Sequence, residues 1–302
     1  MNSIIFLLVI YISSICFLRI RNKEYFGLKR QLTDFSTFLV PFNIPAYLFS
    51  KIPTTHKVSL SCFPELKILE NNWEDIRDEA LVLFESGCLV KRDDEFLGSS
   101  FYGGNRWTSF YLKAYEKNMK SAYELAPKTM SLIEQVPSMH MAMFACLNPG
   151  KLINHHHDPF SHTLRYSLGL STPNSDASGI VINGENFIWS DGEGIAFDAT
   201  YFHRAYNNSK KPRIILVTDL ERPLKFKWLQ SFYYRFGRYL IDSLTFHSEN
   251  NKRKEFRYKF VSFLLKYRKF LINFKAKNKQ LYTVSKLFTV WSVLVLLVYI
   301  LL

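Results

Sequence analysis

The sequence has few cysteines, a shortage of acidic residues and none of the common nucleotide-binding motifs. Its four cysteines, Cys16, Cys62, Cys88 and Cys146, are never in CxxC spacing, which argues against a zinc cluster or a disulfide framework and fits a reducing compartment. No GxGxxG or Walker sequence is present, so the nucleotide-binding α/β folds are disfavoured. The chain is not short of apolar residues, because 48% of its 302 residues are hydrophobic. A sizeable folded core is therefore expected.

The net charge of +13 is concentrated near the C-terminus. Between residues 225 and 280 there are 15 lysines and arginines against three acids, together with 15 aromatic residues. Apolar positions recur there at helical spacing with basic residues between them, which predicts basic aromatic interfacial helices over 225–283 that lie against an anionic membrane surface. The same composition could form stacking platforms for RNA, but the segment leads into an apolar terminus. We therefore expect no nucleic-acid partner.

Both ends of the sequence are apolar and uncharged. Residues 1–18 predict an N-terminal transmembrane anchor, and residues 284–302 predict a C-terminal transmembrane or membrane-inserted helix. A cleaved signal peptide is the alternative for the first run, although that run lacks a basic leading segment. A shallow insertion or a core helix is the alternative for the second. Basic residues flank both runs on the side of the intervening chain, so the positive-inside rule places 19–286 in the cytoplasm.

The region between these ends changes character at Pro137. Residues 19–136 predict a membrane-proximal helical region that packs on the core, with a helix in "FPELKILENNWEDIRDEALVLFESG", a C-cap at Gly87, and further helical pieces in "SFYLKAYEK" and "APKTMSLIEQVP". From 137 to 224, short β-rich runs such as "HMAMFACL", "HTLRYSLGL" and "RIILVTD" alternate with turn residues. With no helical stretch between them, they predict a mainly β catalytic core, an antiparallel sandwich or small barrel.

A histidine triplet followed by an aspartate lies in this β-rich region, at residues 155–158. Alternate residues of a strand share a face, so a metal site could use His155 with His157 or His156 with Asp158. A further histidine, His203, follows a later β-run. Two histidines and one carboxylate from two strands form the facial triad typical of non-haem iron(II) oxygenases, and only the second pair supplies a carboxylate. We therefore predict His156, Asp158 and His203 as metal ligands.

An arginine lies ten residues beyond His203. Arg213 opens the next β-run, where it could be a surface strand cation or could clamp a carboxylate through two hydrogen bonds. The residue pattern alone leaves both interpretations open.

These segments resemble one known family. "HHHDPFSHTLRYSLGL" and "GEGIAFDATYFHRAYNNSKKPRIILVTDLERPL" resemble the aspartyl/asparaginyl β-hydroxylase family of Fe(II) and 2-oxoglutarate dioxygenases. "RQLTDFSTF", "FPELKILENNWEDIRDEAL" and "RYSLGLSTPNSD", with the apolar N-terminus, resemble its bacterial lipid A 2-hydroxylase branch. The resemblance covers about residues 1–224. It implies a double-stranded β-helix core, a cupin-like jelly roll, with flanking α-helices.

The resemblance also implies roles for single residues. His156 would be the proximal metal ligand, His203 the distal ligand, and Arg213 the anchor of the distal carboxylate of 2-oxoglutarate, with Arg165 as a second co-substrate contact. Animal members of the family have glycine in place of Asp158, whereas the lipid A branch has aspartate. Ser167 stands where the family usually has a histidine that touches the co-substrate in the animal enzymes, and its hydroxyl could donate one hydrogen bond there.

The function that the resemblance implies is hydroxylation of an acyl chain of lipid A, with Fe(II), 2-oxoglutarate and molecular oxygen as cofactors. The expected location is the bacterial inner membrane, with the catalytic domain facing the cytoplasm. Two alternatives remain at this point. One is a peptidyl aspartyl/asparaginyl β-hydroxylase, and the other is a non-catalytic lipid-binding relative, which the serine at position 167 keeps open.

Overall fold

In the computed structural model, the described residues are 2–32, 34–88, 107–115 and 117–244, with a few short pieces between 270 and 285. The chain divides into two compact units. One unit is Met1–Pro45 together with His247–Leu302, and the other is Ala46–Phe246. Each unit is described by itself below.

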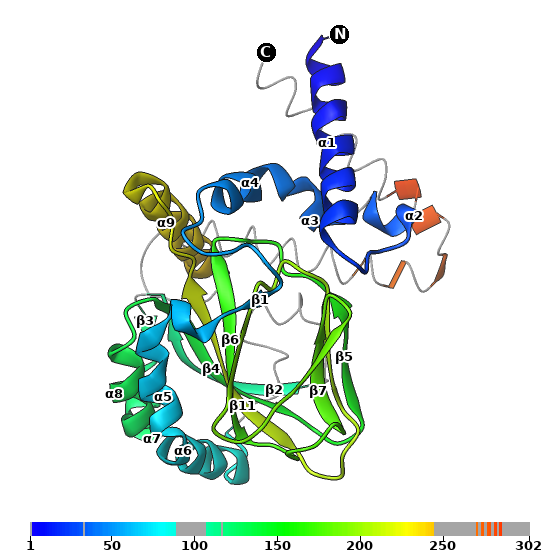
Figure 1. Cartoon of the computed structure of the whole chain (residues 1–302). Coiled ribbons are helices and arrows are strands. Elements are labelled where there is room, and N and C mark those ends of the chain that lie inside the picture. The colour runs from blue at the N-terminus through cyan, green and yellow to red at the C-terminus, as the bar shows by residue number, and fades with distance from the viewer. Residues whose placement is uncertain are drawn as a thin grey trace. The chain divides into compact units, whose positions relative to one another are not determined.

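Two antiparallel sheets form the body of the second unit (Figure 1). The larger has seven strands in the order β1-β9-β6-β11-β4-β2-β3, and the smaller has four in the order β5-β10-β7-β8. The predicted mainly β core with flanking helices is therefore confirmed. The strands are β1 (Lys57–Val58), β2 (Trp107–Ala114), β3 (Lys117–Asn118), β4 (Met139–Leu147), β5 (Lys151–His156), β6 (Thr163–Ser171), β7 (Ser178–Ile182), β8 (Glu185–Ile188), β9 (Gly194–Phe197), β10 (His203–Asn207) and β11 (Arg213–Glu221).

Strand β6 lies between two hydrophobic cores, one on each face of the larger sheet. Leu164, Tyr166 and Leu168 belong to the cluster that the larger sheet forms with the helices. Because successive residues of a strand face opposite sides, Arg165 and Ser167 face the other way. A second cluster on that side combines apolar residues of both sheets. The polar residues of β6 are thus buried on the side of the larger sheet that faces the smaller one.

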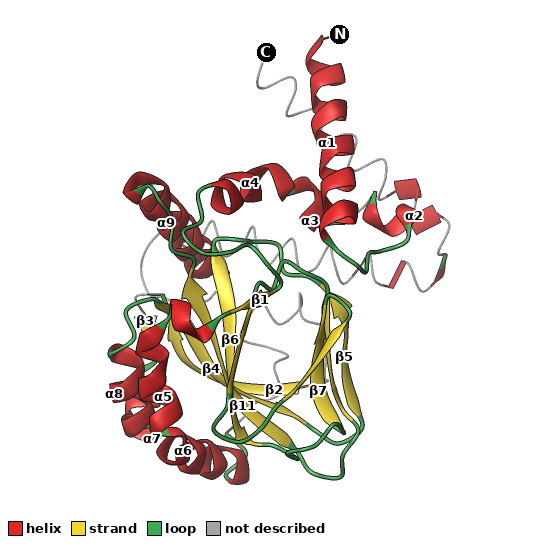
Figure 2. Ribbon diagram, in the orientation of Figure 1, coloured by secondary structure: helices red, strands yellow, loops and turns green. Residues whose placement is uncertain are grey.

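Four helices cover the other face of the larger sheet (Figure 2). α5 (Lys67–Asn71) and α6 (Trp73–Glu85) confirm the helix predicted before Gly87, which has a positive φ of 74° suited to glycine just past a helix end. α7 (Lys120–Leu125) precedes α8 (Pro127–Glu134), which confirms the second predicted helical piece. Two short 3₁₀ helices lie before α5, and their bounds are Leu60–Cys62 and Pro64–Leu66.

The helix predicted in "SFYLKAYEK" is wrong, because this segment lies mostly in β2. In β2, Leu112 belongs to the core that the larger sheet forms with the helices, Ala114 is also buried, and the strand pairs with β4 over most of its length. A short run with apolar residues every two to four positions fits both the helical period and the two-residue period of a strand. Pairing with β4 therefore decides its structure. α9 (Lys227–Leu244) follows the last strand and begins the predicted basic aromatic region. The remainder of that region is outside the described residues, apart from the short pieces near its end.

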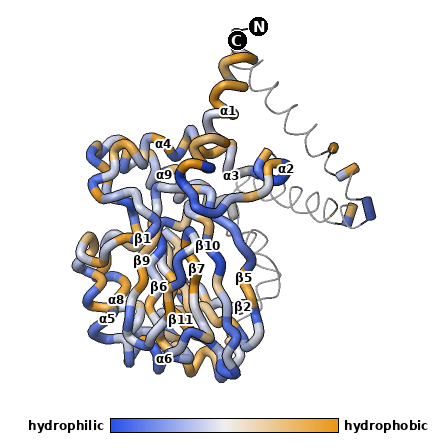
Figure 3. Tube along the Cα trace, turned by 45° about the vertical axis from the view of Figure 1, so that its right-hand side comes forward, coloured by the Kyte–Doolittle hydropathy of each residue, from blue (hydrophilic) through white to orange (hydrophobic). Residues whose placement is uncertain are grey.

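The N-terminal part of the first unit is helical. α1 (Asn2–Arg21) is followed by α2 (Leu28–Gln31) and α3 (Phe35–Phe38), and α4 (Val40–Leu48) crosses the division between the units. Figure 3 shows hydrophobic residues along much of α1, and Tyr11 of α1 stacks on Phe38 of α3 at 4.9 Å.

The transmembrane helices predicted at the two ends are not supported. Among the described residues, no helix combines the length and the apolarity needed to cross a membrane. On α1, Tyr11, Ser14 and Leu18 are buried within the protein. Nearly all of 284–302 lies outside the described part of the chain.

Candidate active site

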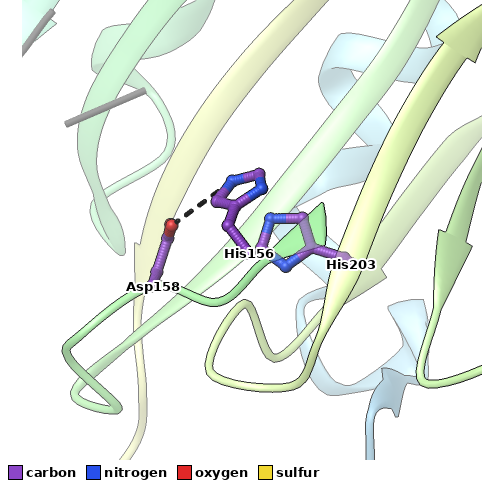
Figure 4. Close-up of side chains that lie close together, drawn as sticks. All are labelled: His156, Asp158 and His203. Carbon is purple, nitrogen blue, oxygen red and sulfur yellow. Dashed lines mark ion pairs between the residues drawn. The ribbon is translucent and has the colours of Figure 1, made fainter. Parts of the chain in front are cut away.

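The structure brings together the three residues predicted as metal ligands (Figure 4). His156 is the last residue of β5, His203 is the first residue of β10, and these two residues are direct partners across the antiparallel pair. Asp158 follows in the loop after β5. One possible ligand atom from each residue lies within 4.8 Å of the others, and His156 Nε2 is 3.9 Å from Asp158 Oδ1. Two strands of the smaller sheet and one loop thus converge on a single point.

Hydrogen bonds to the backbone set the tautomers of both histidines. His156 Nδ1 lies 2.7 Å from the Asn154 carbonyl oxygen, and His203 Nδ1 lies 2.9 Å from the Tyr201 carbonyl oxygen. A carbonyl oxygen can only accept, so Nδ1 must carry the proton in each ring, and Nε2 is left with a lone pair. Burial lowers the pKa of His203 to about 3, which keeps this imidazole neutral. His203 therefore has the form that a metal ion requires, and the hydrogen bond at Nδ1 of His156 orients that ring in the same way.

Asp158 is held in place by its backbone and by an arginine. Its amide donates to the Ala199 carbonyl oxygen at 2.7 Å, and its Oδ2 accepts from Arg165 Nη2 at 2.8 Å. Burial favours the neutral acid, but Arg165 and the nearby histidines outweigh it and hold the pKa of Asp158 below its usual value. The carboxylate is therefore ionised at neutral pH, as a metal ligand must be.

The other two histidines of the triplet contact a different residue. The rings of His155 and His157 lie 4.9 Å and 4.6 Å from the ring of Phe202. The register predicted from strand alternation, with His156 and Asp158 on one face, is the one that places a carboxylate beside His203.

Arg213 is almost completely buried, at 1% exposure. Its guanidinium lies over the Trp189 ring, 4.3 Å from the ring centre. Within the described residues it has no ion pair or hydrogen bond, and both Arg213 Nε and Trp189 Nε1 are buried donors without an acceptor. Burial lowers the pKa of Arg213 to about 10, so the group remains a cation at neutral pH. A buried cation beside a spare N–H donor fits a carboxylate ligand well.

Arg165 and Ser167 lie on β6, on the face of the larger sheet that also carries Arg213. Arg165 Nε donates to Asp219 Oδ1 at 2.7 Å, in addition to the bond from Nη2 to Asp158. Burial raises the pKa of Asp219, and the adjacent arginine opposes the rise. Ser167 is buried at 2% exposure, between Val217 of β11 and Ile195 of β9. The co-substrate contacts expected of Arg165 and Ser167 stay predictions.

The sequence reasoning missed the ion pairs that support the site. Asp219 was not predicted, although it lies six residues after Arg213, a spacing that puts both on one face of a strand. A second pair joins Arg222 to Asp198 at 2.6 Å, and both side chains are fully buried. Arg222 Nε also donates to the Ser161 carbonyl oxygen at 2.5 Å. This arginine thus links the loop after Asp158 to the turn that precedes His203.

A known family matches the part of the chain that contains this site. The family model described as aspartyl/asparaginyl beta-hydroxylase matches residues 70–223, about half of the chain. The chain belongs to the aspartyl/asparaginyl β-hydroxylase family. All six site residues predicted from the sequence lie inside the matched segment, and so does the missed Asp219.

Several known proteins are similar in sequence to this β-hydroxylase family member over this part of the chain. The ornithine lipid ester-linked acyl 2-hydroxylase of Rhizobium tropici is 27% identical over 180 residues, which cover 59% of this chain and 64% of that protein. Human aspartyl/asparaginyl beta-hydroxylase is 28% identical over 164 residues, 52% of this chain and 21% of that protein. Mouse aspartate beta-hydroxylase domain-containing protein 2 is 33% identical over 187 residues, 59% of this chain and 54% of that protein. The match spans less than two thirds of each relative.

The solved structures that align with this β-hydroxylase family member do so with low TM-scores. A prolyl-4-hydroxylase of Pseudomonas putida aligns with a TM-score of 0.36 and 13% identity, over 51% of this chain and 87% of that chain. A Cupin_2 domain of a transcriptional regulator from Enterobacter cloacae aligns with a TM-score of 0.27 and 13% identity, over 39% of this chain and 99% of that chain. Similarities of this size have no bearing on the function of the chain.

Proposed function

We propose that the protein is an Fe(II)- and 2-oxoglutarate-dependent hydroxylase that acts on the acyl chain of a membrane lipid. The observation that carries this proposal is the presence of two sites in one unit: the rings of His156 and His203 beside an ionised Asp158, and a buried Arg213 that has no carboxylate partner among the described residues. Two neutral imidazoles and one carboxylate suit Fe(II) and leave coordination positions open. The lone arginine suits the distal carboxylate of a dicarboxylic co-substrate.

Each residue has a role that follows from its contacts. His156, Asp158 and His203 would hold the metal, and the backbone carbonyls at Nδ1 keep the two rings in the orientation that presents Nε2. Arg213 would orient the co-substrate by pairing with its free carboxylate. When bound, Fe(II) and 2-oxoglutarate supply the oxidising chemistry that inserts one oxygen atom of O₂ into a C–H bond, with release of succinate and CO₂.

The lipid substrate is proposed from three considerations. One relative is named as a 2-hydroxylase of an ornithine lipid acyl chain, and the sequence resembles the lipid A branch of the family. α9 also carries Trp228, exposed at 68%, next to Lys227, a combination that suits an anionic lipid surface. Within this class we propose an acyl chain of lipid A at the cytoplasmic face of a bacterial inner membrane. A peptidyl aspartyl or asparaginyl side chain is the second candidate, because another relative is named for that activity.

The test measures succinate formed by the purified full-length protein with Fe(II), 2-oxoglutarate and O₂. Separate arms contain lipid A, an ornithine lipid or an Asp/Asn peptide, and mass spectrometry of each substrate detects a gain of one oxygen atom. Hydroxylation of a lipid arm supports the proposal, and hydroxylation of the peptide alone replaces it with the second candidate. His156→Ala and His203→Ala should each abolish metal binding and succinate formation, whereas His155→Ala should leave metal binding intact. A wild-type protein that binds no Fe(II) would refute the proposal.

A further inference from the structure

Arg165 lies between two carboxylates at one end of the larger sheet. It is 9% exposed. Its Nη2 donates to Asp158 Oδ2 at 2.8 Å, and its Nε donates to Asp219 Oδ1 at 2.7 Å. The guanidinium is therefore fixed at two different nitrogens by two different side chains, so its plane is defined as well as its position.

We propose that Arg165 and Asp219 are a positioning pair that fixes Asp158 as a metal ligand through one oxygen only. The inference rests on the proposed metal site. Asp158 Oδ2 is occupied by Arg165, whereas Oδ1 is the oxygen that faces His156 Nε2 at 3.9 Å. A carboxylate held in this way offers the metal one oxygen and not both.

Asp219 is needed because Asp158 belongs to a loop and Arg165 has a long, flexible side chain. Arg165 and Asp219 are direct partners across the antiparallel pair of β6 and β11. Two adjacent strands thus hold the guanidinium, and the guanidinium in turn holds the loop carboxylate. Outer residues that orient a ligand change metal affinity by 10- to 100-fold when they are replaced.

The experiment compares metal affinity in the full-length protein. Co(II) serves as a spectroscopic substitute for Fe(II), and its visible absorption bands report both affinity and coordination. Asp219→Ala should weaken Co(II) binding about 10-fold or more and change the bands. Asp219→Asn should restore most of the affinity, because its amide oxygen can still accept the hydrogen bond from Arg165 Nε. Glu221→Gln is the matched control, since Glu221 lies on the same strand and pairs with His140 instead, and it should bind Co(II) like the wild type.

A double-mutant cycle separates positioning from a general structural or electrostatic effect. If Asp219 acts through Asp158, then Asp219→Ala should have no further effect on Co(II) affinity once Asp158→Ala is present. An equal loss in both backgrounds would overturn the inference. Arg165→Lys is the second variant, because one ammonium group cannot keep both bonds in this geometry, and its Co(II) affinity should fall as in Asp219→Ala.

Unchanged Co(II) affinity and bands in both Asp219→Ala and Arg165→Lys would also overturn the inference, while the proposed function would stand. If the wild type bound no Co(II), the proposed metal site itself would fail. The two failures are therefore distinguishable.

Discussion

Two arginines on the same face of the larger sheet have opposite environments. Arg165, at one end, bonds to two carboxylates, whereas Arg213, at the start of β11, lies over an indole and has no carboxylate among the described residues. A folded chain does not bury a cation without a counter-ion unless something compensates for the lost hydration. The difference indicates that Arg165 is already neutralised by carboxylates of the protein, whereas the charge of Arg213 is suited to an anionic ligand.

The largest expected effect is on folding stability, when each arginine is replaced by methionine in the metal-free protein. Arg165→Met leaves the buried carboxylate of Asp158 and the partly exposed carboxylate of Asp219 without a cation, and should lower the free energy of unfolding by about 4 kcal/mol. Arg213→Met removes a buried charge that has no carboxylate partner in the described part of the chain, and the variant should stay within about 1 kcal/mol of wild type. Urea unfolding at neutral pH measures both. Equal losses in the two variants would show that Arg213 also has a partner in the folded protein.

The second effect is on co-substrate binding, where we expect replacement of Arg213, which matters little for stability, to have a large effect. In the metal-loaded protein, Arg213→Met should weaken 2-oxoglutarate binding by on the order of 100-fold, or about 3 kcal/mol, because a charge-assisted pair in a buried site is lost. Calorimetric titration with 2-oxoglutarate gives the affinity. Metal affinity, measured in the same preparation, should be unchanged, since Arg213 contacts none of the three predicted ligands. Wild-type affinity for 2-oxoglutarate would refute the role of Arg213.

The sequence predicted the side chains of the site better than their supports. Strand alternation, a rule of local geometry, limited the choice to His155 with His157 or His156 with Asp158, and the need for a carboxylate selected the second pair. Asp219 and the fully buried pair of Arg222 and Asp198 were missed, because their roles depend on which strands become neighbours. Long-range pairing of that kind is not encoded in a local pattern. The helix predicted in the segment of β2 was wrong for the same reason. The local sequence pattern fits a helix or a strand, and pairing with β4 determines that it is a strand.

The third effect concerns pH and should arise at the Arg165 end of the sheet, where buried ionisable groups are concentrated. His162, just before β6, stacks on Tyr233 at 5.3 Å, and burial, with smaller contributions from His140 and Arg222, lowers its pKa to about 3. As the pH falls, His162 of the unfolded chain is protonated near pH 6.5, whereas His162 of the folded chain stays neutral down to about pH 3. Stability from this group is full above pH 6.5 and is lost as the pH falls through that window.

His162→Phe tests this contribution, because phenylalanine keeps a flat ring beside Tyr233 and does not titrate. Between pH 7 and pH 5 the wild type should lose about 2 kcal/mol more of its unfolding free energy than the variant. The depressed pKa of His203 is common to both proteins and cancels in the difference. Parallel pH dependence of the two proteins in urea unfolding would mean that His162 is protonated in the fold, and that the Arg165 end tolerates charge there.

The smallest effect is expected at Ser167, which lies on β6 two residues after Arg165, on the same face. Its hydroxyl has no hydrogen-bond partner within the described part of the chain, although its side chain is buried at 2% exposure. A hydroxyl in that state can donate to a carboxylate that arrives, so Ser167→Ala should weaken 2-oxoglutarate binding about 5-fold, the equivalent of about 1 kcal/mol for one hydrogen bond. Unfolding stability should not change, because no bond within the protein is lost. If Ser167→Ala bound 2-oxoglutarate like the wild type, Ser167 would be removed from the predicted co-substrate contacts, and Arg213 and Arg165 would remain.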